Sequence, residues 1–193
     1  MQRAVEALER STRAQRAIID ELLDVSRIST GRLRLALNLV DLAQVVREAV
    51  EVTKPAMEAK GIHCDTRLDF QVGLVLGDRA RLGQVAGHLL SNAARVTPRG
   101  GRVEVRLERR GSQACLAVCD TGPGIRPEIL PFAFERFRQA VRTPGPTQGG
   151  LGLGLSTARH IVEPHRGTVR AESGGEGAGS TFIVLLPLTD DRA

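Results

Sequence analysis

The stretch Gly150-Leu151-Gly152-Leu153-Gly154-Leu155 alternates glycine with leucine and leads directly into an apolar, helix-like sequence that ends at Val162. Three glycines at the start of a helix expose backbone N–H groups, and the helix dipole adds to their attraction for an anion. A leucine stands where a dinucleotide-binding loop needs its third glycine, and the chain contains no Gly-Lys-Ser/Thr of a P-loop. The stretch therefore predicts a phosphate cradle of another kind, with a loop needed only for tight packing as the alternative.

A carboxylate precedes this stretch at the end of a strand-like run. Asp120 follows the apolar residues 114–118 and is itself followed by Thr-Gly-Pro-Gly124. A carboxylate at a strand end can accept a hydrogen bond from the exocyclic amine of adenine. The glycines would let the backbone pass close to a ring. A plain turn explains the same residues, so this motif alone leaves both interpretations open.

Two further polar elements flank these motifs. Asn92 lies one helical turn after His88, so both side chains share one face of the expected helix 79–95. An amide oxygen suits Mg²⁺, which keeps most of its ligands as water and phosphate, although Asn92 could also bond locally. The last glycines, in Gly177-Ala-Gly-Ser-Thr181, introduce a final strand, and a hairpin turn would explain them fully.

The periodicity of apolar residues places these motifs in a mixed fold. We expect helices over 2–28, 42–60, 79–95 and 151–162, helical turns over 127–138, and strands over 33–39, 62–68, 73–76, 102–107, 114–118, 168–172 and 181–186. Asp41 should cap the second helix, Gly61 should close it, and Pro55 should kink or break it. Short turns between consecutive strands favour an α/β (α+β) two-layer sandwich, with a mixed sheet packed on helices and one long helix in front.

The composition is that of a globular protein with an aliphatic core. Trp and Tyr are absent, no apolar run approaches the roughly 20 residues of a membrane span, and the first residues lack a signal-peptide core. The three cysteines are odd in number and are expected to be buried, reduced thiols, which fits a cytoplasmic protein. The net charge of +5 is carried by arginines mixed with acidic residues, so solvated helix faces are expected rather than a nucleic-acid partner.

Taken in order, the motifs resemble the catalytic ATP-binding domain of sensor histidine kinases, of the gyrase, chaperone, kinase and mismatch-repair superfamily. The resemblance covers about residues 30–188 and implies a Bergerat-type ATP-binding fold. Residues 1–29 resemble the second helix of the dimerisation hairpin of these kinases. The matching segments are Leu82–Pro98 for the asparagine box, Asp120–Gly124 for the first glycine box, Phe134–Phe137 for the phenylalanine box, Gly150–Leu155 for the second glycine box and Gly179–Phe182 for the last.

By this resemblance the chain would bind ATP together with Mg²⁺. Asn92 would hold the metal, and Asp120 would bind the adenine amine. Arg95 stands where a lysine is usual, and its guanidinium can still pair with a phosphate, although with a different geometry. Residues 139–149 would form a lid over the triphosphate. The other residues implied to bind the nucleotide are Gly122 and Gly124 at the adenine, Gly150, Gly152, Leu153, Gly154 and Leu155 at the phosphates, and Thr181, through its hydroxyl, at the adenine end.

Position 88 departs from the family. His88 replaces a usual asparagine, and the ATP-hydrolysing members of the superfamily carry a glutamate base at this position. We hypothesise that His88 touches a metal-bound water or a phosphate oxygen, which makes it a candidate catalytic residue beside Asn92 and Arg95. An ATP-hydrolysing relative is an alternative that the missing glutamate disfavours. A degenerate dimerisation or docking domain is another, because Val96 also stands where an aromatic residue is common.

The phospho-acceptor of the family is missing. It is a histidine followed by an acidic residue on the first helix of the hairpin, whereas the histidines here precede Cys, Leu, Ile and Arg, at His63, His88, His160 and His165. We therefore expect a catalytic domain over 30–193 and one hairpin helix over 1–29, which cannot autophosphorylate by themselves. The implied partners are a histidine-bearing hairpin, a response regulator receiver domain and a second copy of the full-length protein in a homodimer.

Overall fold

The computed structural model describes residues 34–135 and 152–189 of the 193-residue chain. The helix expected over 2–28, the domain boundary at residue 29 and the lid at 139–149 lie outside the described residues. Among those described, no helix is long and apolar enough to cross a bilayer.

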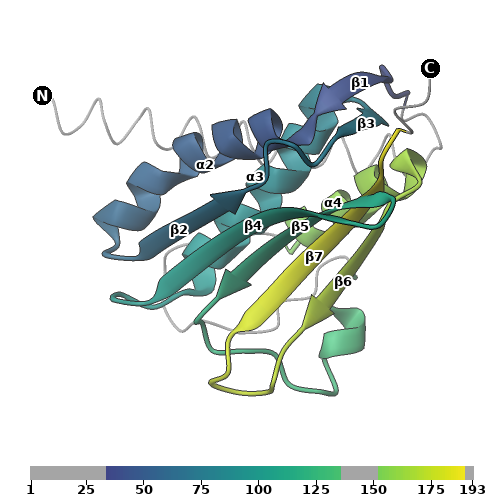
Figure 1. Ribbon diagram of the computed structural model, residues 1–193. Coiled ribbons are helices and arrows are strands. Elements are labelled where there is room, and N and C mark those ends of the chain that lie inside the picture. The colour runs from purple at the N-terminus through teal and green to yellow at the C-terminus, as the bar shows by residue number, and fades with distance from the viewer. Residues whose placement is uncertain (1–33, 136–151, 190–193) are drawn as a thin grey trace, which may run out of the picture. The chain divides into compact units, whose positions relative to one another are not determined.

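Helices and strands alternate irregularly along the described chain (Figure 1). A five-stranded sheet has the order β2-β4-β5-β7-β6, in which β2 and β4 are parallel and the other neighbours are antiparallel. A separate two-stranded sheet joins β1 to β3. The elements are β1 (Asn38–Asp41), α2 (Leu42–Ala59), β2 (His63–Leu68), β3 (Leu74–Gly77), α3 (Arg79–Val96), β4 (Arg102–Arg110), β5 (Gln113–Asp120), η1 (Leu130–Phe132), α4 (Gly154–Val162), η2 (Glu163–His165), β6 (Thr168–Glu172) and β7 (Ser180–Pro187).

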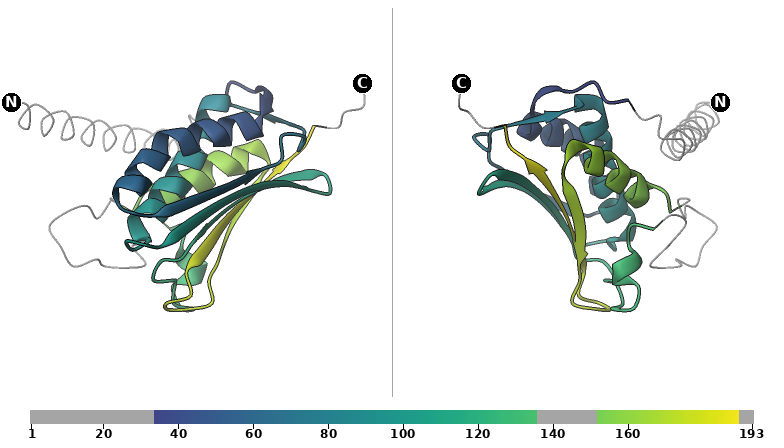
Figure 2. Two further views of the ribbon diagram at one scale, coloured as in Figure 1. Left: turned by 60° about the vertical axis from the view of Figure 1, so that its left-hand side comes forward. Right: turned by 90° about the vertical axis from the view of Figure 1, so that its right-hand side faces the viewer.

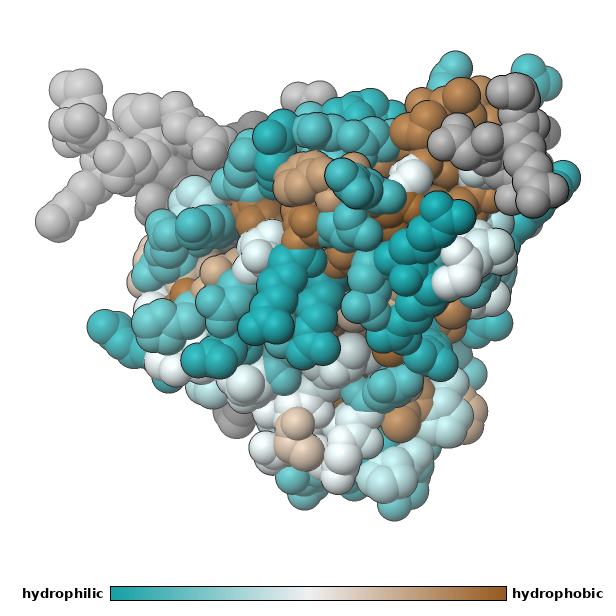
Figure 3. All heavy atoms as spheres, in the orientation of Figure 1, coloured by the Kyte–Doolittle hydropathy of each residue, from teal (hydrophilic) through white to brown (hydrophobic). Residues whose placement is uncertain are grey.

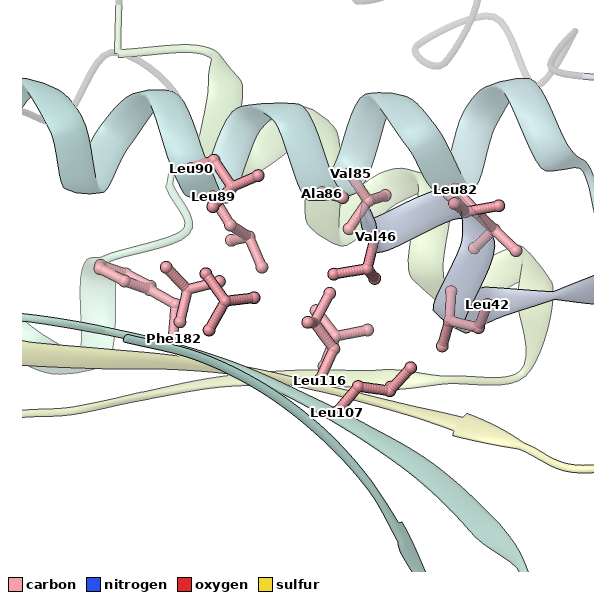
Figure 4. Close-up of a cluster of buried hydrophobic side chains, with 14 of the residues drawn as sticks. Leu42, Val46, Leu82, Val85, Ala86, Leu89, Leu90, Leu107, Leu116 and Phe182 are labelled. Carbon is pink, nitrogen blue, oxygen red and sulfur yellow. The ribbon is translucent and has the colours of Figure 1, made fainter. Parts of the chain in front are cut away.

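The core lies between one face of the large sheet and the helices. Figure 2 shows α2, α3 and α4 on the same side of this sheet. Alternate residues of a strand point to opposite faces, so β4, β5 and β7 each turn an apolar row towards the helices. The close-up in Figure 4 shows the buried Leu107, Leu116 and Phe182 of the strands beneath Leu82 and Leu89 of α3. The predicted α+β sandwich with an aliphatic core is confirmed.

Charged side chains cover the opposite face of the sheet. Figure 3 shows this face as largely hydrophilic. Arg106 donates to Glu104 at 2.5 Å, Arg110 donates to Glu108 at 2.6 Å, and the nitrogen of Arg67 lies 3.4 Å from Glu104. Each such exposed pair contributes little stability. The pairs nevertheless show that many arginines of the sheet are solvated partners of acidic residues. Helix faces carry such pairs as well, as the sequence indicated, between Arg47 and Glu51 on α2 and between Arg159 and Glu163 at the end of α4.

The three cysteines are free. Burial raises the pKa of the Cys115 and Cys64 thiols, so both stay protonated near neutral pH. Cys115 is fully buried, whereas Cys64 and Cys119 are half-buried. The expectation of buried thiols therefore holds in full only for Cys115.

Several predicted boundaries differ from the structure. The strand predicted over 33–39 is wrong in its bounds, because β1 pairs with β3 only from Asn38 to Asp41. The final helix begins at Gly154 rather than Leu151, since Gly152 has a φ of +69° outside the helical range. The expected break at Pro55 is also absent from α2, which runs through this exposed residue to Ala59. Asp41 caps α2 as predicted, by accepting from Ala43 N at 2.9 Å.

Helix α4 carries two neighbouring buried hydroxyls, of Ser156 and Thr157, that differ in their hydrogen bonding. Ser156 Oγ donates to Leu153 O at 2.8 Å, whereas Thr157 Oγ1 has no hydrogen-bond partner within residues 34–135 and 152–189. Thr157→Val should raise the free energy of unfolding by about 1 kcal/mol, because an unsatisfied buried hydroxyl is removed at nearly constant shape. Urea denaturation measures this change. Ser156→Ala, which removes a bonded hydroxyl, is the control and should lower the same free energy by about 1 kcal/mol. A destabilised Thr157→Val variant would contradict the assignment.

Candidate functional site

Asp120 is a buried carboxylate at the end of β5, with 6% of its surface exposed. One of its oxygens accepts from Gly122 N at 2.8 Å, and the other accepts from the Ser180 hydroxyl at 2.5 Å. A carboxylate can accept about four hydrogen bonds, so it retains lone pairs for a ligand that donates. Asp120 is thus held rigidly and still able to bind an amine.

The hydroxyl beside Asp120 belongs to Ser180 and not to Thr181. β5 and β7 pair Asp120 with Ser180 and Cys119 with Thr181. Directly paired residues share a face of the sheet and the next pair lies on the other face, so Thr181 points away from Asp120. The hydroxyl expected from Thr181 is therefore supplied by Ser180 in the structure. The strand register decides between these adjacent residues.

The predicted glycines lie where backbones pass closely. A Cβ at Gly122 would lie 2.6 Å from Asp120 Oδ1 and 3.1 Å from Val96 Cγ2. Gly124 has a φ of +73°, and a Cβ there would strike the carbonyl oxygen of Gly175. These glycines let the loop after β5 fold against both the end of α3 and the turn between β6 and β7.

The end of α3 carries the amide and the guanidinium that were predicted. Arg95 Nη2 donates to Asn92 Oδ1 at 2.7 Å. Desolvation lowers the pKa of Arg95, but an arginine starts so high that it stays charged near neutral pH. Lys60, at the end of α2, donates to the carbonyls of Ala94 and Arg95 at 2.9 Å each. Its role was missed from sequence, because 34 residues separate it from Ala94 and no local pattern connects them.

The start of α4 lies against α3. A Cβ at Gly154 would be 3.0 Å from His88 Nδ1, so the first turn of α4 approaches the face of α3 that carries His88. Leu153 is buried and the half-buried Leu155 packs against the core, so both anchor this start. Gly152 provides the positive φ that precedes it. Gly150 lies outside the described residues.

Helix α3 connects the two groups of predicted residues. Val96 lies beside Gly122, and His88 lies beside Gly154. These two positions of α3 are eight residues apart, or ~12 Å along the helix. The loop after Asp120 and the start of α4 are therefore held on one helix, with Asn92 and Arg95 between them.

Of the phenylalanine box, the structure describes Phe134 and Glu135. The ring of Phe134 meets the core ring of Phe182 edge to face, with centroids 6.0 Å apart and an interplanar angle of 87°. This contact anchors the chain at the end of the described range 34–135. Phe137 lies outside the described residues.

The side chains at this site fit a magnesium ion that takes most of its ligands from phosphate and water. Among the described residues, no group of three or more His, Cys, Asp or Glu side chains could hold a metal. Asn92 offers one amide oxygen, and Mg²⁺ commonly takes few protein ligands and completes its shell with phosphate and water. The bond from Arg95 occupies one lone pair of this oxygen and leaves the second for an ion.

Comparison with known proteins identifies the family and the fold of this chain. A family model described as "Histidine kinase-, DNA gyrase B-, and HSP90-like ATPase" matches residues 77–190. The sensor-like histidine kinase SenX3 of Mycobacterium tuberculosis (strain H37Rv) is 36% identical over 171 residues, which cover 88% of this chain and 41% of SenX3. This chain spans less than half the length of the curated relatives that it matches first.

Two solved structures share the fold. The mycobacterial sensor histidine kinase MprB is 29% identical with a TM-score of 0.68, over 78% of this chain and 97% of that one. Full-length ShkA, in complex with AMPPNP, is 26% identical with a TM-score of 0.81, over 100% of this chain and 40% of that one. The chain therefore belongs to the histidine kinase-, DNA gyrase B- and HSP90-like ATPase family, and its fold is that of the ATP-binding catalytic domain of sensor histidine kinases.

Proposed function

We propose that this chain binds ATP with Mg²⁺ and that its parent protein transfers the γ-phosphoryl group to a histidine on a helical hairpin. The observation that carries the proposal is the buried Asp120 carboxylate, held by Gly122 and Ser180 and left with lone pairs for the adenine amine. The backbone N–H groups at the start of α4, beside His88, would receive the phosphates.

The residues between these ends would position the triphosphate. Asn92 would place its amide oxygen on the metal, and Arg95, which uses one of its five N–H donors on Asn92, would pair with a phosphate oxygen through the others. Bound Mg²⁺ would neutralise charge on the phosphates, which is most of what phosphoryl transfer requires besides positioning. We propose that Ser180, rather than Thr181, supplies the hydroxyl at the adenine end.

The remaining partners are proposed from the family. They are the histidine-bearing dimerisation hairpin, a response regulator receiver domain and a second copy of the full-length protein. Since the reaction consumes ATP, we expect this domain to lie in the cytoplasm of the cell. The chain spans 41% of SenX3, so the activity proposed is that of a longer protein.

An Asn92→Ala variant tests the metal part of the proposal. We expect Mg²⁺ to strengthen ATP binding by the wild-type chain and this gain to fall at least about 10-fold in the variant, because a metal ligand is lost. Isothermal titration with ATP, with and without Mg²⁺, measures the gain. His88→Asn in the same titration tests whether His88 contacts the bound group. An unchanged affinity and pH dependence would exclude that role.

The second step of the experiment separates the reactions. A histidine-bearing hairpin is added to the wild-type chain with labelled ATP, and acid-labile phosphate on the hairpin is measured. Phosphate on the hairpin supports the kinase. Steady release of inorganic phosphate without transfer supports an ATP-hydrolysing relative instead. A wild-type chain that does not bind ATP would contradict the proposal and leave a docking domain.

A further inference from the structure

The hydroxyl of Ser173 lies where backbone groups of two separate segments converge. Ser173 directly follows β6 and directly precedes the glycine-rich turn 174–179. Its Oγ donates to Gly179 O at 2.7 Å, and it accepts from Ile125 N at 2.9 Å and from Gly175 N at 3.3 Å. One side chain thus joins the turn between β6 and β7 to the loop after β5.

These two segments leave the sheet at its paired Asp120 and Ser180. The loop 121–125 begins at Asp120, and the turn 174–179 ends immediately before Ser180. A second bond joins them, from Gly177 N to Pro123 O at 2.6 Å. The contacts of Ser173 therefore fix both segments that position the two donors to the Asp120 carboxylate.

The turn has little conformational preference of its own. It contains four glycines, and Gly175, Gly177 and Gly179 all have positive φ. Glycine loses more conformational freedom on ordering than any other residue, so such a turn needs external bonds to stay in one conformation. Without the Ser173 hydroxyl, the buried Ile125 N–H and Gly179 carbonyl would lose the bonds that they make to it.

We infer that Ser173 is a positioning residue of the base site. Its hydroxyl holds the two segments so that Gly122 and Ser180 keep the Asp120 carboxylate in place, which sets the preference for a base with an exocyclic amine. This inference rests on the proposed function. It goes further by naming a side chain outside the nucleotide-binding motifs that controls base selection.

A pair of nucleotides tests this inference. We compare the affinities of the wild-type chain and of Ser173→Ala for ADP and for an ADP analogue that lacks the 6-amino group. The variant should bind ADP about 10-fold more weakly, which corresponds to the loss of one hydrogen bond of ordinary strength, and the analogue almost unchanged. The ratio of the two affinities should therefore fall. General destabilisation would weaken both nucleotides and leave the ratio unchanged.

Two further variants act as controls. Ser173→Thr keeps the hydroxyl and should restore the preference, and Ser112→Ala, in the exposed turn between β4 and β5, should leave it unchanged. If Ser173→Ala does not fold, the ratio of the two affinities is measured with Ser173→Cys instead. This ratio should fall as well, because a thiol has a similar size to a hydroxyl but is a weak donor and acceptor. If Ser173→Ala keeps the wild-type preference for ADP over the analogue, the inference about Ser173 is wrong and the proposed function still stands. A wild-type chain that binds neither nucleotide overturns the proposed function as well.

Discussion

An Asp120→Asn variant is expected to bind ADP about 100-fold more weakly than the wild-type chain, a loss of ~3 kcal/mol that is typical of a hydrogen bond to a charged group. Gly122 N–H and the Ser180 hydroxyl both donate to this carboxylate. An amide has one oxygen, and its NH₂ group would meet the Ser180 hydroxyl, which can turn to accept. The fold should survive, whereas the base amine would lose its charged acceptor. Titration with ADP measures the loss.

The control for this variant removes a carboxylate on the face of the large sheet that points away from the helices. Asp65 is exposed on β2, and its carboxylate lies 3.4 Å from the Arg102 side chain. Asp65→Asn has the same change of charge and should leave the affinity for ADP unchanged. An ADP analogue without the 6-amino group should bind to Asp120→Asn and to the wild-type chain with similar affinity. Equal affinity of Asp120→Asn and wild type for ADP would exclude Asp120 as the acceptor of the base amine.

Much of the fold could be predicted because the signals are local. Asp41 caps α2 through N–H groups two and three residues away, so its role is visible in the sequence. Gly61, with a φ of +72°, closes the same helix as expected. The apolar alternation of β4, β5 and β7 predicted their core faces. Local signals say less about where pairing stops: β4 extends to Arg110, beyond its last inward apolar residue, because the hairpin with β5 continues to Gln113.

The candidate site needed information that no local pattern contains. Ser180 and Thr181 are adjacent hydroxyls, and only the pairing of β5 with β7 decides which one meets Asp120. Lys60 and Ser173 act on backbone atoms of segments that are distant in sequence. Such contacts depend on how elements pack, which is why the predicted motifs contain the candidate ligand-binding groups but not the side chains that support them.

Gly124→Ala is expected to lower the free energy of unfolding by about 3 kcal/mol or more, whereas Gly177→Ala should lower it by only about 1 kcal/mol. The two residues have φ values of +73° and +80°, so alanine meets a similar backbone penalty at both. Their surroundings differ: nothing lies within 4 Å of a Cβ at Gly177, whereas a Cβ at Gly124 strikes the carbonyl of Gly175. Urea denaturation of both variants measures the difference.

The difference between these two variants isolates the close approach of two backbones. The Gly175 carbonyl cannot simply move away from Gly124, because the Ser173 hydroxyl and the bond from Gly177 N to Pro123 O hold the turn in place. Relief would require the turn to separate from the loop after Asp120, so Gly124→Ala should also weaken ADP binding. Gly177→Ala should leave that binding nearly intact. Equal losses of stability in the two variants would mean that the two segments are not packed backbone to backbone. The inference that they hold the Asp120 carboxylate rigidly would then be wrong.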